Sequence, residues 1–165
     1  QEIPGRATYL HKGQSYSVLI DFAHTPSSFE AIFALAQELR VPGARIIAVF
    51  GSAGGGRDKW KRPELGKIAA RYADYIVLTT DDPYQEDPQV ICTDIAQGIA
   101  SAPFYGTLDI VLDRRSAIRR ALQRAQGNDI VLFLGKGTEP ALMIGDASIP
   151  WDEAQIVGEE ILVQL

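Results

Sequence analysis

The sequence predicts an α/β fold in which a mostly parallel β-sheet carries helices on both faces. Three observations lead to this fold class. Short, almost wholly apolar runs alternate with longer segments of helical periodicity along the chain. The apolar runs are typical of strands that are buried on both faces of a sheet. The most polar and glycine-rich loops follow these runs, where ligands bind in such sheets, so the expected arrangement is Rossmann-like.

Length and composition indicate one globular domain. The 165 residues, of which 46% are hydrophobic, suffice for a core, and a net charge of −5 provides no basic face for nucleic acid. No apolar run approaches the roughly 18 residues of a membrane span, so we expect no membrane contact. Cys92 is the only cysteine, which favours a reduced, cytoplasmic setting. Because the chain starts at Gln1 with linker-like residues, we expect a piece of a longer protein.

The first half of the chain is predicted to contain four strands, over residues 7–11, 17–22, 46–50 and 75–80. A helix follows the second strand, with Thr25 as N-cap and Pro26 at its first position, both favoured at helix starts. Another helix is expected from about Pro63 to Ala73. The expected apolar face of the first helix comprises Phe29, Ile32, Phe33, Ala36 and Leu39.

The second half continues the alternation. Asp87-Pro88 is expected to cap a helix that runs to about residue 99, and Asp113 a helix over residues 114–126. Strands are expected over residues 108–112 and 129–134, followed by a hairpin around Gly145-Asp146 and a final helix over 152–165. The residues expected to face inward from the helix after Asp87 are Val90, Ile91, Ile95 and Ile99.

The chain is organised around a glycine loop, residues 51–62, between a buried strand and a helix. Glycines let the backbone approach a ligand, and the charged residues that follow can bind an anion. The loop matches neither standard phosphate motif. A Walker loop needs Lys and Ser or Thr where Arg57 and Asp58 stand, and a dinucleotide fingerprint needs glycine in place of Ala53. The loop therefore binds a ligand in another way or only turns the chain.

Five short motifs occur in a characteristic order. They are Pro4-Gly5-Arg6, Asp21-Phe22-Ala23-His24-Thr25-Pro26, Gly56-Arg57-Asp58-Lys59 with Lys61-Arg62-Pro63, Asp81-Asp82-Pro83, and Gly135-Lys136-Gly137 with Glu139. Together they resemble the C-terminal domain of the Mur ligases. Within that family they are most similar to the UDP-N-acetylmuramoyl-L-alanyl-D-glutamate ligases, which add the third residue of the peptidoglycan stem peptide. The resemblance covers essentially the whole chain.

The resemblance implies that residues 1–165 form one domain, the third of three in an ATP-dependent acid–amino-acid ligase. In this family the first domain holds the UDP sugar, and the middle domain carries the P-loop and the Mg²⁺ ligands. The carboxylate of the UDP-N-acetylmuramoyl dipeptide is activated as an acyl phosphate, which the amine of an amino acid then attacks. The third domain closes over ATP and delivers the amino acid.

The expected task of this domain is therefore orientation and charge, without a catalytic residue or a metal ligand of its own. We expect the isolated domain to be inactive. Its expected partners are the N-terminal and middle domains of the same protein, the dipeptide, ATP and the amino acid.

The resemblance assigns the amino acid substrate to a group of loop residues. Arg57 matches the arginine that binds the α-carboxylate. The alternative is that Arg57 is an ordinary surface arginine. Glu139 matches the residue that binds the α-amino group. The alternative is that Glu139 is a solvated loop carboxylate without a ligand. Lys136 either holds an anion or lies in a tight turn. The expected amino acid site consists of Arg57, Asp81, Asp82, Tyr84, Gly135 and Glu139.

The nucleotide is assigned by the same resemblance to Arg6, Asp21 and His24. Arg6 and Asp21 match positions that contact phosphate and ribose, although Asp21 could instead cap the start of the Thr25 helix. His24 lies beside a helix N-terminus, whose dipole favours the neutral ring, but a lone histidine in a turn is often structural. The basic residues at the next helix start are expected to be solvated, with Arg62 the better functional candidate; they are Lys59, Lys61 and Arg62.

Two departures from the family pattern bear on the substrate. Diaminopimelate-adding members have Asn and Arg at the positions of Asp82 and Tyr84, and the family usually has His at the position of Thr138. The added acid and the missing arginine predict a basic amino acid, lysine or ornithine, over meso-diaminopimelate. Two other functions stay open. One is a non-catalytic Rossmann-like binding module of a regulatory subunit, and the other is a superfamily ligase of folylpolyglutamate or cyanophycin type.

Overall fold

The computed structural model describes residues 7–165, so Arg6 and its predicted phosphate contact lie outside the described residues. Within this range, a six-stranded sheet has the order β1-β2-β6-β3-β4-β5, and only the β1–β2 pair is antiparallel. The predicted α/β class with a mostly parallel sheet is confirmed. The strands are β1 (Thr8–Tyr9), β2 (Ser17–Asp21), β3 (Ile46–Phe50), β4 (Tyr75–Leu78), β5 (Thr107–Ile110) and β6 (Ile130–Leu134).

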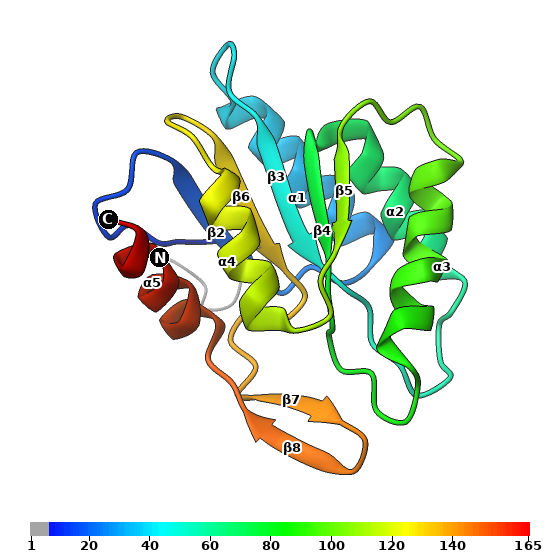
Figure 1. Cartoon of the computed structure of the whole chain (residues 1–165). Helices are drawn as coiled ribbons and strands as arrows, with labels where there is room; N and C mark the ends of the chain where they lie inside the picture. The colour runs from blue at the N-terminus through cyan, green and yellow to red at the C-terminus, as the bar shows by residue number, and fades with distance from the viewer. Residues whose placement is uncertain (1–6) are drawn as a thin grey trace.

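Helices cover both faces of the sheet, as predicted (Figure 1). On one face lie α1 (Pro26–Leu39), α2 (Lys61–Tyr72) and α3 (Pro88–Ala100); on the other lie α4 (Arg114–Arg124) and α5 (Glu153–Gln164). Every residue of β3 is buried, and its side chains alternate between the two cores because successive strand residues point to opposite faces. Among the described helices, none is both long and apolar enough to cross a lipid bilayer.

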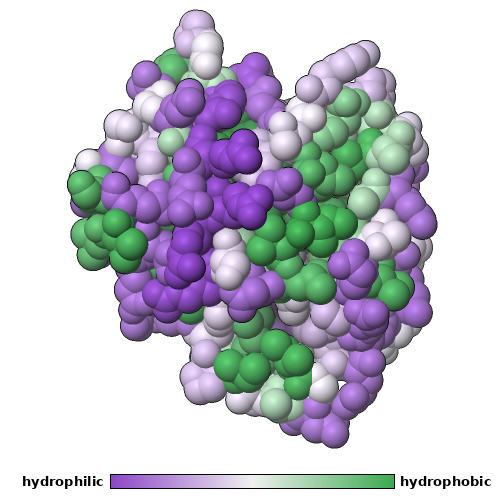
Figure 2. All heavy atoms as spheres, viewed as in Figure 1, coloured by the Kyte–Doolittle hydropathy of each residue, from purple (hydrophilic) through white to green (hydrophobic). Residues whose placement is uncertain are grey.

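A separate antiparallel hairpin, β7 (Ala141–Ile144) and β8 (Ala147–Pro150), projects beyond the lower end of the sheet in Figure 1. Figure 2 shows hydrophobic side chains on its surface, where Ile144 and Ile149 are each 41% exposed, and a hydrophilic band over α4. This is the hairpin predicted around Gly145-Asp146. It contacts the ligand-binding end of the sheet, which is described below.

Side chains cap the starts of four helices, and three of these caps, those of α1, α3 and α4, were predicted. The Thr25 side chain accepts a hydrogen bond from the backbone N–H of Ser28, which closes a capping box, and Pro26 is the first residue of α1. Helices α3, α4 and α5 are capped in the same way by Asp87, Asp113 and Asp152. These starts were predictable because an N-cap contacts amides only two or three residues away.

Helix α2 begins at Lys61, two residues before the predicted Pro63. The N–H groups of Lys61 and Arg62 donate to the carbonyls of Asp58 and Lys59, which adds a turn ahead of the proline. Pro63 is tolerated at the third helical position, because N–H groups of the first turn have no partner inside the helix.

Two residues expected to face the core are exposed instead. Leu39 is 45% exposed because it is the last residue of α1, where the chain leaves the sheet. Val90 is 52% exposed because it lies one position outside the inward arc of α3. The three isoleucines predicted with it, Ile91, Ile95 and Ile99, are buried.

Helices α2 and α3 approach each other closely, because each presents a glycine to the backbone of the other. A Cβ added at Gly66 would lie 2.2 Å from the carbonyl oxygen of Ile95, and one at Gly98 would lie 1.9 Å from that of Pro63. No side chain fits at either distance, so main-chain contact fixes the spacing of the two helices.

We therefore expect Gly98→Ala to destabilise the domain by about 1–3 kcal/mol or more, because a methyl group there forces the helices apart. Urea unfolding followed by circular dichroism measures this loss. Gly127→Ala is the matched control, since its added Cβ would lie 3.7 Å from Ser15 Oγ, an ordinary contact. Equal losses for the two variants would show that the contact between the helices is not tight.

Candidate functional site

Four of the five motifs lie in or beside loops at one end of the sheet. The His24 loop follows β2, the glycine loop follows β3, the acidic loop (residues 81–87) follows β4, and Gly135-Lys136-Gly137 follows β6. These strands are parallel neighbours in the order β2-β6-β3-β4, so their carboxyl ends form one row. Ligands bind at this edge in open α/β sheets, which makes it the candidate functional site.

The ammonium group of Lys136 joins two of these loops. The residue is fully buried, and its Nζ lies 3.0 Å from Asp82 Oδ1, 2.8 Å from Glu139 Oε2 and 3.9 Å from Asp81 Oδ1. Burial opposes the charge, but the carboxylates outweigh it and raise the pKa of Lys136 above its ordinary value. Lys136 is therefore used inside the protein and is not free to hold an external anion.

Asp82 is the junction of the site. Its backbone carbonyl accepts a hydrogen bond from Gly54 N at 2.7 Å, and its Oδ1 accepts from both Lys136 and the backbone N–H of Met143, the latter at 2.8 Å. One residue of the acidic loop thus contacts the glycine loop, the Gly-Lys-Gly loop and the hairpin. Within residues 7–165 its Oδ2 has no hydrogen-bond partner.

Asp81 lies behind the site. It is only 7% exposed, and its Oδ1 accepts a hydrogen bond from the backbone N–H of Asp82 at 2.8 Å. Burial raises the pKa of the Asp81 carboxyl, although Arg114 and Lys136 oppose the shift. Burial therefore argues against a direct substrate contact for Asp81, whereas the substrate contact of Asp82 stays a prediction. The predicted partner Gly135 is also buried, and its N–H donates to the carbonyl of Asp21 at 3.0 Å.

Tyr84 has an unusual backbone conformation, with φ at +52°, a region that bulky residues seldom adopt. Two hydrogen bonds with the hairpin hold it there, from Tyr84 N to Met143 O at 3.1 Å and from Gly145 N to Tyr84 O at 2.7 Å. The half-exposed ring lies against the glycine loop, because a Cβ on Gly55 would be 3.6 Å from its Cδ2. Strain of this kind is found at ligand sites, where the surrounding structure compensates for it.

The two principal residues expected to bind the amino acid are both accessible. Arg57 is exposed near the tip of the glycine loop, and its guanidinium forms no ion pair within residues 7–165. The Glu139 side chain is 39% exposed, and its Oε2 accepts the hydrogen bond from Lys136, which leaves Oε1 available. Of the three basic residues expected to be solvated, Lys61 and Arg62 are buried and only Lys59 is exposed.

A groove of about 480 Å³ lies at the N-terminal end of α1. It is lined by residues of the preceding loop, including Asp21, Phe22 and His24, and by residues of the helix itself. Both oxygens of Asp21 accept backbone hydrogen bonds at 2.6 Å, Oδ1 from Ala23 N and Oδ2 from Ala7 N. Asp21 thus fixes the turn before the helix and lines the groove, but it does not cap the helix, whose N-cap is Thr25.

His24 is exposed at the same groove, and its Nδ1 lies 2.9 Å from the carbonyl oxygen of Phe22. Because a carbonyl can only accept, Nδ1 is the donor in this contact. The ring also packs on Phe22 with centroids 4.6 Å apart. The structure therefore orients this histidine.

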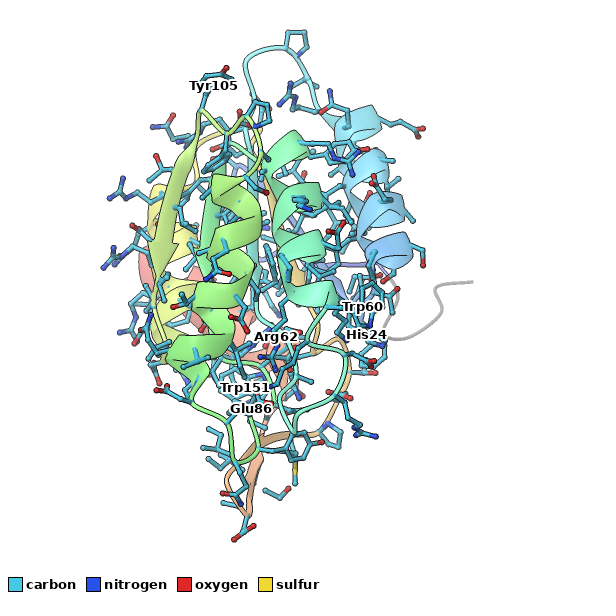
Figure 3. The ribbon with its side chains drawn as sticks, turned by 90° about the vertical axis from the view of Figure 1, so that its right-hand side faces the viewer. His24, Trp60, Arg62, Glu86, Tyr105 and Trp151 are labelled. Carbon is cyan, nitrogen blue, oxygen red and sulfur yellow. The ribbon has the colours of Figure 1, made fainter. Side chains whose placement is uncertain are left out.

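A second hollow, of about 710 Å³, lies at the other end of the molecule beside Tyr105 (Figure 3). Its three arginines are already paired with carboxylates, so they offer no free positive charge for a ligand. The pairs are Arg40–Asp74, Arg45–Asp129 and Arg71–Glu30.

Arg114 supports the site from within, and the sequence analysis did not identify it. The residue is 2% exposed, and it donates to both oxygens of Glu153, at 3.0 and 2.6 Å, and to the carbonyls of Thr80 and Leu134. It thereby joins the ends of β4 and β6 to the start of α5. The only local sign in the sequence is its place directly after the N-cap Asp113, which does not reveal its partners.

Comparison with known proteins identifies the family. The family described as Mur ligase, glutamate ligase domain, matches residues 5–137. The chain belongs to the Mur ligase family. The resemblance inferred from the five motifs is thus confirmed for this Mur ligase chain.

Two curated relatives extend the match. The UDP-N-acetylmuramyl-tripeptide synthetase of Treponema denticola is 43% identical over 92% of this chain and 28% of its own length. The UDP-N-acetylmuramoyl-L-alanyl-D-glutamate–2,6-diaminopimelate ligase of Caldanaerobacter subterraneus subsp. tengcongensis is 42% identical over 98% of this chain and 32% of its own length. This Mur ligase chain therefore spans about a third of the length of the relatives it matches.

Solved structures agree with this family. A UDP-N-acetylmuramoyl-L-alanyl-D-glutamate–2,6-diaminopimelate ligase superposes with a TM-score of 0.87 at 31% identity, over 98% of this chain and 32% of that one. A folylpolyglutamate synthase of Mycobacterium tuberculosis has a TM-score of 0.59 at 18% identity, over 81% of this chain and 30% of that one, which shows a shared fold alone.

The buried ion pair beneath the site leads to a stability prediction. Glu153→Ala is expected to destabilise the domain by about 3–5 kcal/mol, because it leaves the buried guanidinium of Arg114 without its carboxylate. Thermal or urea unfolding measures the loss. In Lys67→Ala, the control, an exposed pair with Glu64 is removed and a change within about 1 kcal/mol is expected. Losses of similar size would mean that the buried pair has no special role.

Proposed function

We propose that this chain is the C-terminal domain of a longer, cytoplasmic ATP-dependent ligase that adds the third amino acid to the UDP-N-acetylmuramoyl dipeptide in peptidoglycan synthesis. One observation carries the proposal. The loop bearing Arg57 and the loop bearing Glu139 are joined through Asp82 at the ligand-binding end of the sheet. The names of the relatives, tripeptide synthetase and diaminopimelate ligase, support it. Their greater length supports N-terminal and middle domains as partners.

In this function the domain binds and orients the amino acid, and it carries out no covalent step itself. Arg57 offers the fork of N–H donors that suits the α-carboxylate. Glu139 offers Oε1 to the amino group. Its Oε2 is held by Lys136 at 2.8 Å, so Oε1 is the atom left to orient the amine for attack.

ATP supplies the phosphoryl group that activates the dipeptide carboxylate. The groove at the start of α1 fits a role beside the nucleotide, because it combines the oriented imidazole of His24, the Asp21 carboxylate and hydroxyl groups of the first helical turn. We propose Asp21 and His24 for this contact, together with Arg6. We assign Mg²⁺ to the middle domain, since the acidic cluster of Asp81, Asp82 and Glu139 already surrounds the ammonium of Lys136.

The role of Arg57 is tested in the full-length ligase. Arg57→Ala is expected to raise the KM for the amino acid roughly ten- to hundredfold, because a bidentate, charge-assisted contact is lost. The KM values for ATP and the dipeptide should change little. Lys67→Ala, which removes another exposed positive charge of the adjoining helix, serves as the control. Unchanged amino acid kinetics in Arg57→Ala would show that Arg57 does not bind the substrate.

The choice of amino acid follows from the acidic loop. With Asp81 buried, Asp82 Oδ2 is the oxygen of this aspartate pair that can attract a distal ammonium, and residues 81–87 include no arginine to bind a distal carboxylate. We expect lysine or ornithine to be preferred over meso-diaminopimelate, as an amino acid panel with the full-length ligase would show.

The double variant Asp82→Asn with Tyr84→Arg should shift the preference toward diaminopimelate. Asparagine keeps an oxygen that can accept from Lys136 and Met143, so the change alters the free atom and the charge but not the junction. A wild-type preference for diaminopimelate would contradict the charge argument. An unshifted preference in the double variant would show that this loop does not recognise the distal group.

A further inference from the structure

We propose that Glu86 is a positioning residue that holds Arg57 in place for the amino acid, by joining the glycine loop to the buried Arg62. The proposal rests on the function given above, in which Arg57 binds the α-carboxylate. Glu86 belongs to the acidic loop and lies outside the five sequence motifs.

The loop that carries Arg57 needs an external support. Residues 55–60 are all exposed, and Gly55 and Gly56 have φ values of +82° and +76°, which only glycine adopts at little cost. Such a loop has a large conformational entropy to lose when it takes one shape. Because the Arg57 side chain forms no ion pair within residues 7–165, its position depends on contacts of the neighbouring backbone.

Glu86 supplies such a contact with both of its oxygens. Its Oε1 accepts a hydrogen bond at 2.5 Å from the backbone N–H of Gly56, the residue directly before Arg57. Its Oε2 accepts a hydrogen bond at 2.7 Å from Arg62 Nη2, and Lys59 Nζ lies 3.8 Å from Oε1. Partial burial would raise the pKa of Glu86, but the bonds from Arg62 and Gly56 outweigh it and lower the pKa, so the carboxylate stays ionised.

Arg62 is the fixed end of this connection. It is 0% exposed, its Nη1 donates to Asp94 Oδ2 of α3 at 3.0 Å, and its Nη2 also reaches the carbonyl of Ala53 at 3.4 Å. Its Nε has no partner among the described residues, so the fold tolerates a buried, unpaired donor to place the other two nitrogens here. Figure 3 shows Arg62 and Glu86 close together, at the end of the molecule opposite Tyr105.

The connection also couples two parts of the substrate site. The acidic loop carries Asp82 and Tyr84, which lie where the distal group of the amino acid is expected. Through Glu86 the same loop fixes the peptide beside Arg57, which is expected to hold the α-carboxylate. In this arrangement the groups expected to bind the two ends of the amino acid are held at a fixed distance from each other.

A double-mutant cycle in the full-length ligase tests the proposal. Glu86→Ala is expected to raise the KM for the amino acid about tenfold, since small displacements of a binding group are costly, and to leave the KM for ATP within about twofold of wild type. Because Glu86 acts through Arg57, the double variant Glu86→Ala with Arg57→Ala should be no worse than Arg57→Ala alone. Glu86→Gln, which keeps an acceptor for Gly56 N–H, should restore part of the loss.

Glu64→Ala is the matched control, because it removes an exposed carboxylate that pairs with Lys67 and is not part of the connection to the glycine loop. It should leave the KM for the amino acid near the wild-type value. Independent, multiplying effects of Glu86→Ala and Arg57→Ala, or an equal rise in every KM, would overturn the positioning role alone. An Arg57→Ala variant with unchanged amino acid kinetics would overturn both this role and the proposed function of Arg57.

Discussion

The buried ammonium of Lys136 is the interaction on which the rest of the site depends. Lys136 follows β6 and its partner Asp82 follows β4, while β3 lies between these strands in the sheet. The ion pair therefore bridges the end of β3, and the glycine loop that leaves β3 is flanked by the two loops that the pair joins. Without the ammonium, three neighbouring carboxylates would repel one another and the loops would lose their common anchor.

The architecture could be predicted from sequence because its signals are local. The wholly apolar β3 and the N-caps Thr25, Asp87 and Asp113 each depend on residues within a few positions of one another. The burial of charged side chains could not be predicted, because it depends on distant partners. Arg114 and Glu153 are 39 residues apart, and Lys136 and Asp82 are 54 residues apart. A sequence read alone assigns such residues to the surface.

The candidate site shows the same division. The motifs brought Arg57, Glu139 and His24 to one end of the sheet, as the alternation of strands and loops indicated. Asp81 and Asp82 are equivalent in sequence, yet Asp81 is only 7% exposed, whereas the Oδ1 atom of Asp82 joins the Gly-Lys-Gly loop to the hairpin. Glu86 was missed because its importance comes from a backbone N–H and a buried guanidinium, neither of which a motif records.

The glycine contact between α2 and α3 has a consequence for how such ligases diverge. Main-chain atoms at Gly66 and Gly98 set the interval between the helices, so substitutions on their outward faces leave that interval unchanged. The glycine loop leads into α2 and the acidic loop leads into α3. Both loops therefore end at helices whose separation is fixed. Substrate preference can then change through a few loop residues while the scaffold stays the same. This makes residues 81–87 a natural unit for exchange between ligases that use different amino acids.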